Sequence, residues 1–307
     1  MLQLPNSVLL EEQGLRDGLQ MLPESIPTEY KLNLVERLID AGLKRLQVCS
    51  FVNPKLVPQM ADAEELCKLL PKRDDIVFSA LTLNVKGVER AVQAGLRHIA
   101  VSLSASNAHS QKNAHKTLNE ALEEFKQMVR VAKDTGIQVR GGIQSAFGCR
   151  YEGHIPETRV LELVRHHIDC GVDEIALADS TGMGYPLAIQ RVMQEVLRLA
   201  QGKPVILHLH DTENKGLANL YAALEVGVSV FDTAFGGLGG CPFIRGATGN
   251  IATEDTAHFL YQMGISSGVD VRKLAAISSD FATFLGRPLP GKLYKIVQRS
   301  DVQWEVR

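Results

Sequence analysis

The chain has 307 residues, with 33 Lys and Arg against 35 Asp and Glu, so its formal net charge is −2. This balance excludes a nucleic-acid binder that works by bulk positive charge. Hydrophobic residues make up 45% and charged residues 22% of the chain, which is ordinary for a globular protein and excludes a long disordered or fibrous one. The sequence predicts no membrane span, because no run of about 18 apolar residues occurs.

The cysteines and the N-terminus indicate the compartment. The five cysteines are odd in number and lack CxxC spacing, so they predict neither a disulfide framework nor a zinc knuckle. The N-terminus lacks the basic region, apolar stretch and small-residue cleavage site of a secretory signal. We therefore expect a reducing, cytoplasmic setting.

Short β-branched segments alternate with amphipathic segments along most of the chain, and apolar residues in the amphipathic segments recur with the period of a helix. Several helical segments end in a glycine just before the next strand, as a left-handed helix C-cap requires; these glycines are Gly42, Gly95, Gly136, Gly171 and Gly227. The predicted strands are residues 7–15, 45–51, 76–82, 98–106, 138–147, 174–180, 205–211 and 230–237. The predicted helices are residues 28–41, 85–94, 118–134, 157–170, 186–200 and 217–225.

Eight strands, mostly followed by helices, predict a parallel sheet that closes into an α/β TIM (β/α)8 barrel. A doubly wound open sheet is the rival, but the GxGxxG turn expected after its first strand is absent. We assign the barrel to residues 1–252. Residues 253–307 are predicted to add a C-terminal helical extension packed on the barrel.

In such a barrel, functional groups belong at the carboxyl ends of the strands. Polar residues do gather at these ends. They are Arg16, Asp17, Ser50, Ser102, Ser104, Ser106, Gln144, Asp179, Ser180, Thr181, His208 and His210.

His208 and His210 form the sharpest local pattern. Residues i and i+2 of a strand point to the same face, so both imidazoles can enter the barrel mouth and chelate one metal. The alternative is a pair of histidines that cap the strand by hydrogen bonds. Asp17 and Asn250 could add oxygen ligands. This mixed set favours Mg²⁺ or Mn²⁺, with Zn²⁺ less favoured.

Two further features could carry chemistry. Arg16 could hold an oxygen on which negative charge develops, or it could form a buried ion pair with Asp17. The glycine-rich run at residues 236–240 predicts unusual backbone angles and leads into Cys241. The Cys241 thiol could donate a proton or could be a small buried side chain.

Four motifs make the sequence recognisable: RDGLQ at residues 16–20, SFVNPKLVPQMAD at 50–62, HLHD at 208–211 and GGLGGCPFIRGATGNIATED at 236–255. Together they resemble the 3-hydroxy-3-methylglutaryl-CoA lyase family, within a wider group of metal-dependent TIM-barrel lyases and acyltransferases. The resemblance extends over about residues 9–293.

The resemblance implies roles for individual residues. Asp17, His208, His210 and Asn250 would bind a divalent cation, and His208 or Asp17 would act as the base. Arg16 would stabilise the enolate of the departing acetyl product, and Cys241 would help proton transfer. The supporting or substrate-binding positions would be Gln20, Gln47, Ser50, Ser102, Ser104, Gln144, Asp179, Thr181 and Glu254, with Asp179 and Glu254 behind the metal and its ligands.

The implied reaction is a metal-dependent retro-Claisen cleavage of 3-hydroxy-3-methylglutaryl-CoA, or of a close analogue, to acetyl-CoA and acetoacetate or another keto acid. The implied partners are an acyl-CoA substrate and a second copy in a homodimer. The alternatives are a condensing transferase related to isopropylmalate and homocitrate synthases, an aldolase of 4-hydroxy-2-oxo acids, and a non-enzymatic metal-binding or interaction subunit. The intact ligand positions and Cys241 argue against the last.

The chain departs from the lyase pattern at several positions. Gln47 replaces a Glu, and a neutral amide cannot serve as a base or as a charge partner. Asn107 also replaces a Glu, Phe243 replaces a Tyr, and Met21 and Leu22 replace Asn and Glu. These changes leave the acyl group of the substrate open.

Overall fold

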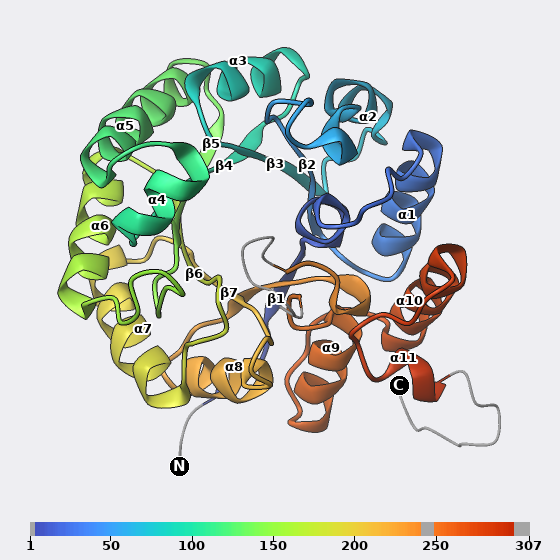
Figure 1. Ribbon diagram of the computed structural model, residues 1–307. Helices are drawn as coiled ribbons and strands as arrows, with labels where there is room; N and C mark the ends of the chain where they lie inside the picture. The colour runs from blue at the N-terminus through green and yellow to red at the C-terminus, as the bar shows by residue number, and fades with distance from the viewer. Residues whose placement is uncertain (1–3, 241–248, 298–307) are drawn as a thin grey trace.

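The structure, a computed structural model, describes residues 4–240 and 249–297 and has a closed barrel of parallel strands at its centre (Figure 1). Neighbouring strands pair in chain order, and β8 closes the ring against β1 with Leu9 opposite Val230. The predicted TIM barrel is thus confirmed. The strands are β1 (Leu9–Glu12), β2 (Arg45–Ser50), β3 (Val77–Thr82), β4 (His98–Ser104), β5 (Gln138–Gln144), β6 (Glu174–Asp179), β7 (Val205–Leu209) and β8 (Val230–Thr233).

A ring of helices surrounds the barrel, and the predicted glycine caps terminate many of them (Figure 1). Gly42, Gly95, Gly136, Gly171 and Gly227 all have positive φ, as the sequence predicted. The helices of the ring are α1 (Thr28–Asp40), α2 (Ala63–Leu69), α3 (Val85–Gln93), α4 (Asn107–Ala114), α5 (Leu118–Asp134), α6 (Glu157–Asp169), α7 (Pro186–Ala200) and α8 (Gly216–Glu225). Among them, α2 and α4 were not predicted.

The C-terminal part adds α9 (Thr253–Gln262), α10 (Val271–Leu285) and α11 (Tyr294–Val297). Helix α10 packs against α1 and α9 (Figure 1). The ring of Phe281 lies edge-on to Phe235 at 5.3 Å between centroids, which joins α10 to the turn after β8. The domain boundary at residue 252 stays a prediction. None of the described helices is long and apolar enough to cross a bilayer.

The first predicted strand, residues 7–15, ends earlier than expected. Residues Gly14–Gly18 form a π-helical turn, η1, instead of continuing β1. The carbonyl of Gln13 accepts from the backbone N–H of Asp17 at 2.7 Å and of Gly18 at 3.3 Å. Arg16 and Asp17 therefore lie on a helical turn above β1. A similar change occurs after β4, where Ser106 caps α4 by accepting from the N–H of His109.

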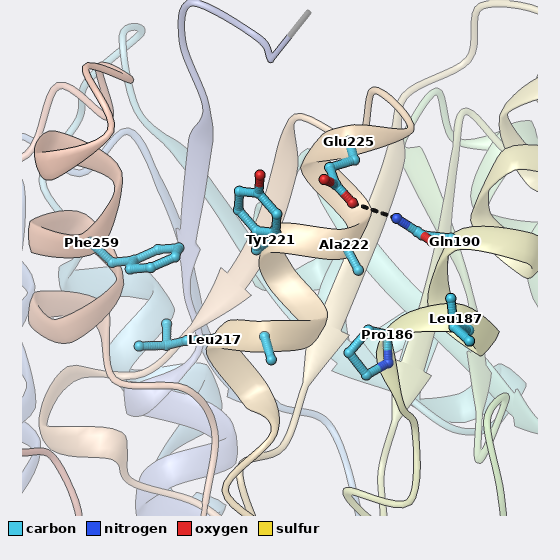
Figure 2. A pocket seen from close by; sticks show the side chains of 9 residues that line it. Pro186, Leu187, Gln190, Leu217, Tyr221, Ala222, Glu225 and Phe259 are labelled. Atoms are coloured by element: carbon cyan, nitrogen blue, oxygen red, sulfur yellow. Dashed lines mark hydrogen bonds between the residues drawn. The ribbon is translucent and has the colours of Figure 1, made fainter. Parts of the chain in front are cut away.

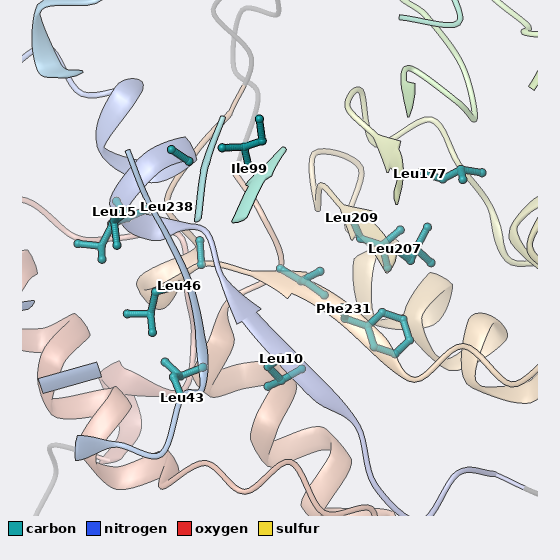
Figure 3. Close-up of a cluster of buried hydrophobic side chains, with 14 of the residues drawn as sticks. Leu10, Leu15, Leu43, Leu46, Ile99, Leu177, Leu207, Leu209, Phe231 and Leu238 are labelled. Carbon is teal, nitrogen blue, oxygen red and sulfur yellow. The ribbon is translucent and has the colours of Figure 1, made fainter. Parts of the chain in front are cut away.

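The strand residues divide between two environments. Leu10, Leu46 and Phe231 belong to the apolar layer between the strands and the helices, part of which is drawn in Figure 3. Alternate residues such as Glu11 and Arg140 point into the barrel, where they form an ion pair. The interior beneath the mouth is thus polar, while the main hydrophobic core encircles the barrel.

Candidate active site

Asp17, His208 and His210 meet at the mouth of the barrel. One potential ligand atom from each lies within 4.8 Å of the others. The Nε2 atom of His210 is 3.6 Å from a carboxylate oxygen of Asp17, and the two imidazole centroids are 5.0 Å apart. The structure therefore brings together a group that could hold a metal ion, built from the ends of β1 and β7.

Asn250 reaches the same place through local strand-like pairing. Residue 250 forms an isolated bridge with His210, and the N–H of Ile251 donates to the carbonyl of Leu209 at 3.1 Å. The Asn250 amide donates to Asp17 Oδ2 at 2.8 Å and to the carbonyl of Leu238 at 3.0 Å. This pairing places Asn250 beside the cluster although it is far from Asp17 in the chain.

The unsatisfied polar atoms around the cluster fit a cation. Both ring nitrogens of His210 and Oδ1 of Asn250 are buried without a hydrogen-bond partner among the described residues. Buried polar atoms are normally paired, so an imidazole nitrogen without a partner beside a carboxylate suits a bound metal ion. Burial would raise the pKa of Asp17, but the neighbouring Arg16 charge and the two histidines hold it well below its usual range.

Arg16 lies beside this cluster in a fixed orientation. Its Nε donates to Oε1 of Gln47 at 2.5 Å, one terminal nitrogen donates to Gln13 at 3.0 Å, and the other pairs with Asp17. Gln47 sits on β2 where the register with β3 shifts. The guanidinium thus adjoins Asp17 while its other contacts are to neutral amides.

A cavity of about 430 Å³ opens above these residues, within the range of small-molecule sites. Arg16, Asp17, His208 and His210 line it. The sequence-predicted residues that also line it are Gln20, Gln47, Ser102 and Gln144.

Three hydroxyl residues predicted for the site lie off this lining. Ser50 donates to Gln20 at 3.3 Å, so it contacts a residue of the cavity wall. Ser104 accepts from the N–H of Ser106, and Thr181 donates to the carbonyl of Gly148. In each case a local hydrogen bond directs the hydroxyl to its own loop or to a neighbouring side chain.

Asp179 and Glu254, which the resemblance places behind the metal and its ligands, accept hydrogen bonds from backbone N–H groups. Asp179 accepts from the N–H of Gly184 at 3.0 Å, and burial raises its pKa to about 6. Glu254 accepts from the N–H of Gly236 at 3.1 Å, and burial, with a smaller contribution from Asp255, raises its pKa to about 8. Both carboxyls thus shape the loops that carry site residues.

Glu12 was not predicted from the sequence, yet it acts in the same way at the base of η1. One oxygen accepts from the N–H groups of Gly14 at 2.6 Å and Phe235 at 3.0 Å. The other oxygen accepts from the Thr253 hydroxyl at 2.7 Å. Burial raises the pKa of Glu12 to about 7 despite these hydrogen bonds. One side chain therefore joins the turn carrying Arg16 and Asp17 to the turn after β8.

Asp232 was missed as well. It lies on β8 directly opposite His208 of β7, and its Oδ2 is 3.0 Å from His208 Nδ1. Burial would raise the pKa of Asp232, but the charge of Arg140 and the bond to His208 lower it below its usual range. The only sequence signal was a single acidic residue inside the apolar strand that neighbours the HxH strand.

The glycine-rich turn closes over the cluster with the unusual backbone angles that the sequence predicted. Gly236, Gly237, Gly239 and Gly240 all have positive φ. A Cβ on Gly239 would lie 2.4 Å from the Asn250 amide nitrogen and 2.9 Å from Asp17 Oδ2. The backbone at 239 thus approaches two candidate ligands at a distance that only glycine allows. Cys241 lies outside the described residues.

A second hollow lies away from this site. Figure 2 shows an apolar groove between α7 and α8, lined by Leu187, Leu217 and Tyr221 and bordered by Phe259 of α9. A hydrogen bond from Gln190 to Glu225 crosses it at 2.5 Å. None of the predicted site residues lines this groove.

A closed (β/α)8 barrel with an Asp–His–His cluster and an arginine at the carboxyl ends of its strands has the architecture of a barrel enzyme with a metal site at its mouth. The HMGL-like family model matches residues 8–281, and the chain belongs to this family. The resemblance predicted from the four motifs is thereby confirmed.

The named relatives agree with this family. The chain is 38% identical to (R)-citramalyl-CoA lyase of Chloroflexus aurantiacus, covering 94% of each chain. It is 38% identical to the mitochondrial hydroxymethylglutaryl-CoA lyase of Bos taurus, covering 94% of this chain and 89% of that one. A solved HMG-CoA lyase of Acinetobacter baumannii, in complex with coenzyme A and 3-methylmalate, superposes with a TM-score of 0.93 at 37% identity, covering 97% and 98% of the two chains.

Proposed function

We propose that this protein is a carbon–carbon lyase that cleaves 3-hydroxy-3-methylglutaryl-CoA to acetyl-CoA and acetoacetate. The observation that carries the proposal is the convergence of Asp17, His208 and His210 beside Arg16 on one cavity. The names of the relatives support the substrate class, since they are lyases of 3-hydroxy-3-methylglutaryl-CoA or of citramalyl-CoA.

The cation would be held by Asp17, His208, His210 and Asn250. Among the described residues, His210 Nε2 has no hydrogen-bond partner and lies 3.6 Å from Asp17, and Oδ1 of Asn250, whose amide nitrogen donates to Asp17, has no partner either. The mixture of hard oxygen and imidazole ligands favours Mg²⁺ or Mn²⁺ over Zn²⁺. When bound, such an ion supplies Lewis-acid polarisation of the substrate oxygens.

Bond cleavage requires that one proton leave the tertiary hydroxyl and that one proton reach the new carbanion. Asp17 and His208 are the two candidates for the group that takes the hydroxyl proton. As the carbon–carbon bond breaks, the hydroxyl carbon becomes the ketone of acetoacetate and the electron pair passes to the enolate of acetyl-CoA.

Arg16 would stabilise this enolate. Its contacts to Gln13, Gln47 and Asp17 fix the guanidinium at the cavity wall without using all of its N–H donors. A preoriented cationic donor of this kind stabilises charge as it develops. Cys241 would then supply the proton that converts the enolate to acetyl-CoA, because it directly follows Gly240, which lines the cavity.

A second candidate substrate is (R)-citramalyl-CoA, favoured by the 38% identity to a lyase of that compound. Its carboxylate is attached directly to the hydroxyl-bearing carbon, whereas that of 3-hydroxy-3-methylglutaryl-CoA is one methylene further away. Both would release acetyl-CoA by the same bond cleavage. The condensing transferase and the 4-hydroxy-2-oxo acid aldolase are not favoured, since the named relatives are acyl-CoA lyases.

The deciding experiment measures acetyl-CoA release from each of the two compounds, after chelation and after return of Mg²⁺ or Mn²⁺. We expect metal-dependent release from 3-hydroxy-3-methylglutaryl-CoA. Faster release from citramalyl-CoA would reassign the substrate and keep the reaction. Absence of release from both, with metal bound, would refute the proposed activity.

We also propose a homodimer in the cytoplasm, on the family resemblance and the cysteine pattern. Sedimentation equilibrium of the purified protein tests the first statement, and a strictly monomeric protein would refute it.

A further inference from the structure

His208 and Asp232 form a contact that the proposed reaction does not use directly. They face each other across the hydrogen-bonded pair β7 and β8, and His208 Nδ1 is 3.0 Å from Asp232 Oδ2. Asp232 is only 2% exposed and His208 only 8%. The contact is therefore largely buried at the cavity wall.

The chemistry of Asp232 decides which way this hydrogen bond runs. The same Oδ2 atom accepts from the Arg140 guanidinium at 2.5 Å, and a guanidinium can only donate. An oxygen in this position is an acceptor, so His208 must donate through Nδ1–H. In the neutral imidazole, Nε2 then keeps its lone pair. That tautomer is the one that can bind a metal through Nε2.

Arg140 is itself held in place from below. Its other terminal nitrogen is 3.1 Å from Glu11 Oε1, and Arg45 bridges Glu11 to Glu174 with contacts of 2.7 Å. Carboxylates and guanidiniums thus alternate along the barrel interior, from Asp232 near the mouth to Glu174. Asp232 and Glu174 are the end carboxylates of this series. Removing either one leaves a buried arginine whose remaining carboxylate partner is Glu11.

His208 and His210 differ in whether the protein fixes a ring nitrogen by a hydrogen bond. Neither ring nitrogen of His210 has a hydrogen-bond partner among the described residues, whereas His208 is fixed through Nδ1. One ligand of the cluster is therefore oriented by the protein before a metal binds.

We propose that Asp232, braced by Arg140, is a positioning residue that sets the Nδ1–H tautomer of His208 and presents Nε2 to the metal. The inference rests on the metal site of the proposed function, but not on its substrate. Carboxylates behind metal-binding histidines orient the ring and increase its basicity, and their loss weakens metal binding about 10- to 100-fold.

The first test measures the wild-type protein, and a variant serves only to assign its signals. In the metal-free protein with ¹⁵N-labelled histidine, long-range ¹H–¹⁵N spectra report which ring nitrogen of His208 is protonated, and the variant His208→Gln assigns the signal. We expect the neutral ring to carry its proton on Nδ1. A predominant Nε2–H form would overturn the proposal.

The second test compares Asp232→Ala with Glu174→Ala in Mn²⁺ titrations. Both variants remove an end carboxylate of the same buried series and leave an arginine paired with Glu11. We expect Asp232→Ala to raise the Kd for Mn²⁺ by about tenfold or more, and Glu174→Ala to leave it within about twofold. Asp232→Asn can keep an acceptor oxygen toward His208, so it should fall between wild type and Asp232→Ala.

Equal effects in the two alanine variants, or an unchanged Kd in Asp232→Ala with a native circular dichroism spectrum, would overturn the proposal. Should Asp232→Ala fail to fold, the tautomer spectrum of the wild-type protein decides. Saturating Mn²⁺ should restore acetyl-CoA release in a folded Asp232→Ala variant, because the defect lies in metal binding. If the wild-type protein releases no acetyl-CoA at all, the proposed activity fails while the tautomer and the Mn²⁺ affinities still test Asp232.

Discussion

The unfolding free energy of the Glu12→Gln variant should increase relative to that of the wild-type protein as the pH rises. Glu12 is fully buried, and its pKa is raised from 4.5 to about 7 by burial. Between these pH values the unfolded chain has lost the Glu12 proton while the folded chain still holds it. The free energy of unfolding contributed by this group is therefore constant below about pH 4.5, falls as the pH rises toward 7, and then levels off.

The magnitude follows from the pKa difference. At about 1.4 kcal/mol per pKa unit, the wild-type protein loses about 3 kcal/mol of unfolding free energy at this one residue. Gln can replace Glu without loss of contacts. Its carbonyl oxygen can accept from Gly14 and Phe235, and its amide can donate to Thr253, whose hydroxyl also lies 2.9 Å from that of Thr233. The variant should therefore fold and keep Mn²⁺ binding.

The assay is urea unfolding of metal-free wild-type and Glu12→Gln proteins at several pH values from about 4 to about 8. Subtracting the two curves cancels the other titrating groups, including Asp179 and Glu254. The exposed Glu29 on α1 provides a matched control as Glu29→Gln. A difference between wild type and Glu12→Gln that stays constant over this range would refute the reasoning, because Glu12 would then ionise alike in both states.

Three further outcomes follow from the site. Gly239→Ala should weaken Mn²⁺ binding about tenfold or more, since φ is +119° and the new Cβ would meet Asn250 and Asp17; an unchanged titration would show that the turn can move away. Asp17→Asn should keep the native circular dichroism spectrum but lose stoichiometric Mn²⁺, and retained metal would remove Asp17 from the ligand set. Cys241→Ser should bind Mn²⁺ normally and lower kcat about a hundredfold in the acetyl-CoA release assay, whereas unchanged turnover would limit Cys241 to packing.

Much of the fold was predictable because the barrel repeats one local pattern. Each predicted strand contains an observed strand, and the glycines after the helices adopt the left-handed angles their positions suggested. The errors lie where a tertiary contact overrides that pattern. Residues 14 and 15 look like a continuation of β1, but Glu12 and the Gln13 carbonyl capture the following N–H groups and wind them into η1.

The site was predictable in part for a similar reason. Polar residues at strand ends identified Arg16, Asp17 and the two histidines, because a parallel barrel brings all strand ends to one face. The same rule misses residues inside the strands. Asp232 and Arg140 lie deeper in the barrel. The contact of Asp232 with His208 depends on the register of β7 with β8, and its contact with Arg140 requires that this side chain point inward from β5. Predicting them would require the three-dimensional pairing first.

The charges of the cavity wall bear on what the site can bind. Two arginines, Arg16 and Arg140, and two aspartates, Asp17 and Asp232, line it, so the formal charge of these four residues is zero. A divalent cation would leave an excess of positive charge, which a substrate carboxylate and an oxygen that loses its proton would neutralise. The resemblance to the lyase pattern implies Glu where this chain has Gln47, and such a Glu would add negative charge next to Arg16. With Gln47, the cavity favours a doubly anionic reacting species more strongly, and Arg16 stays free of a second carboxylate that would compete with the enolate.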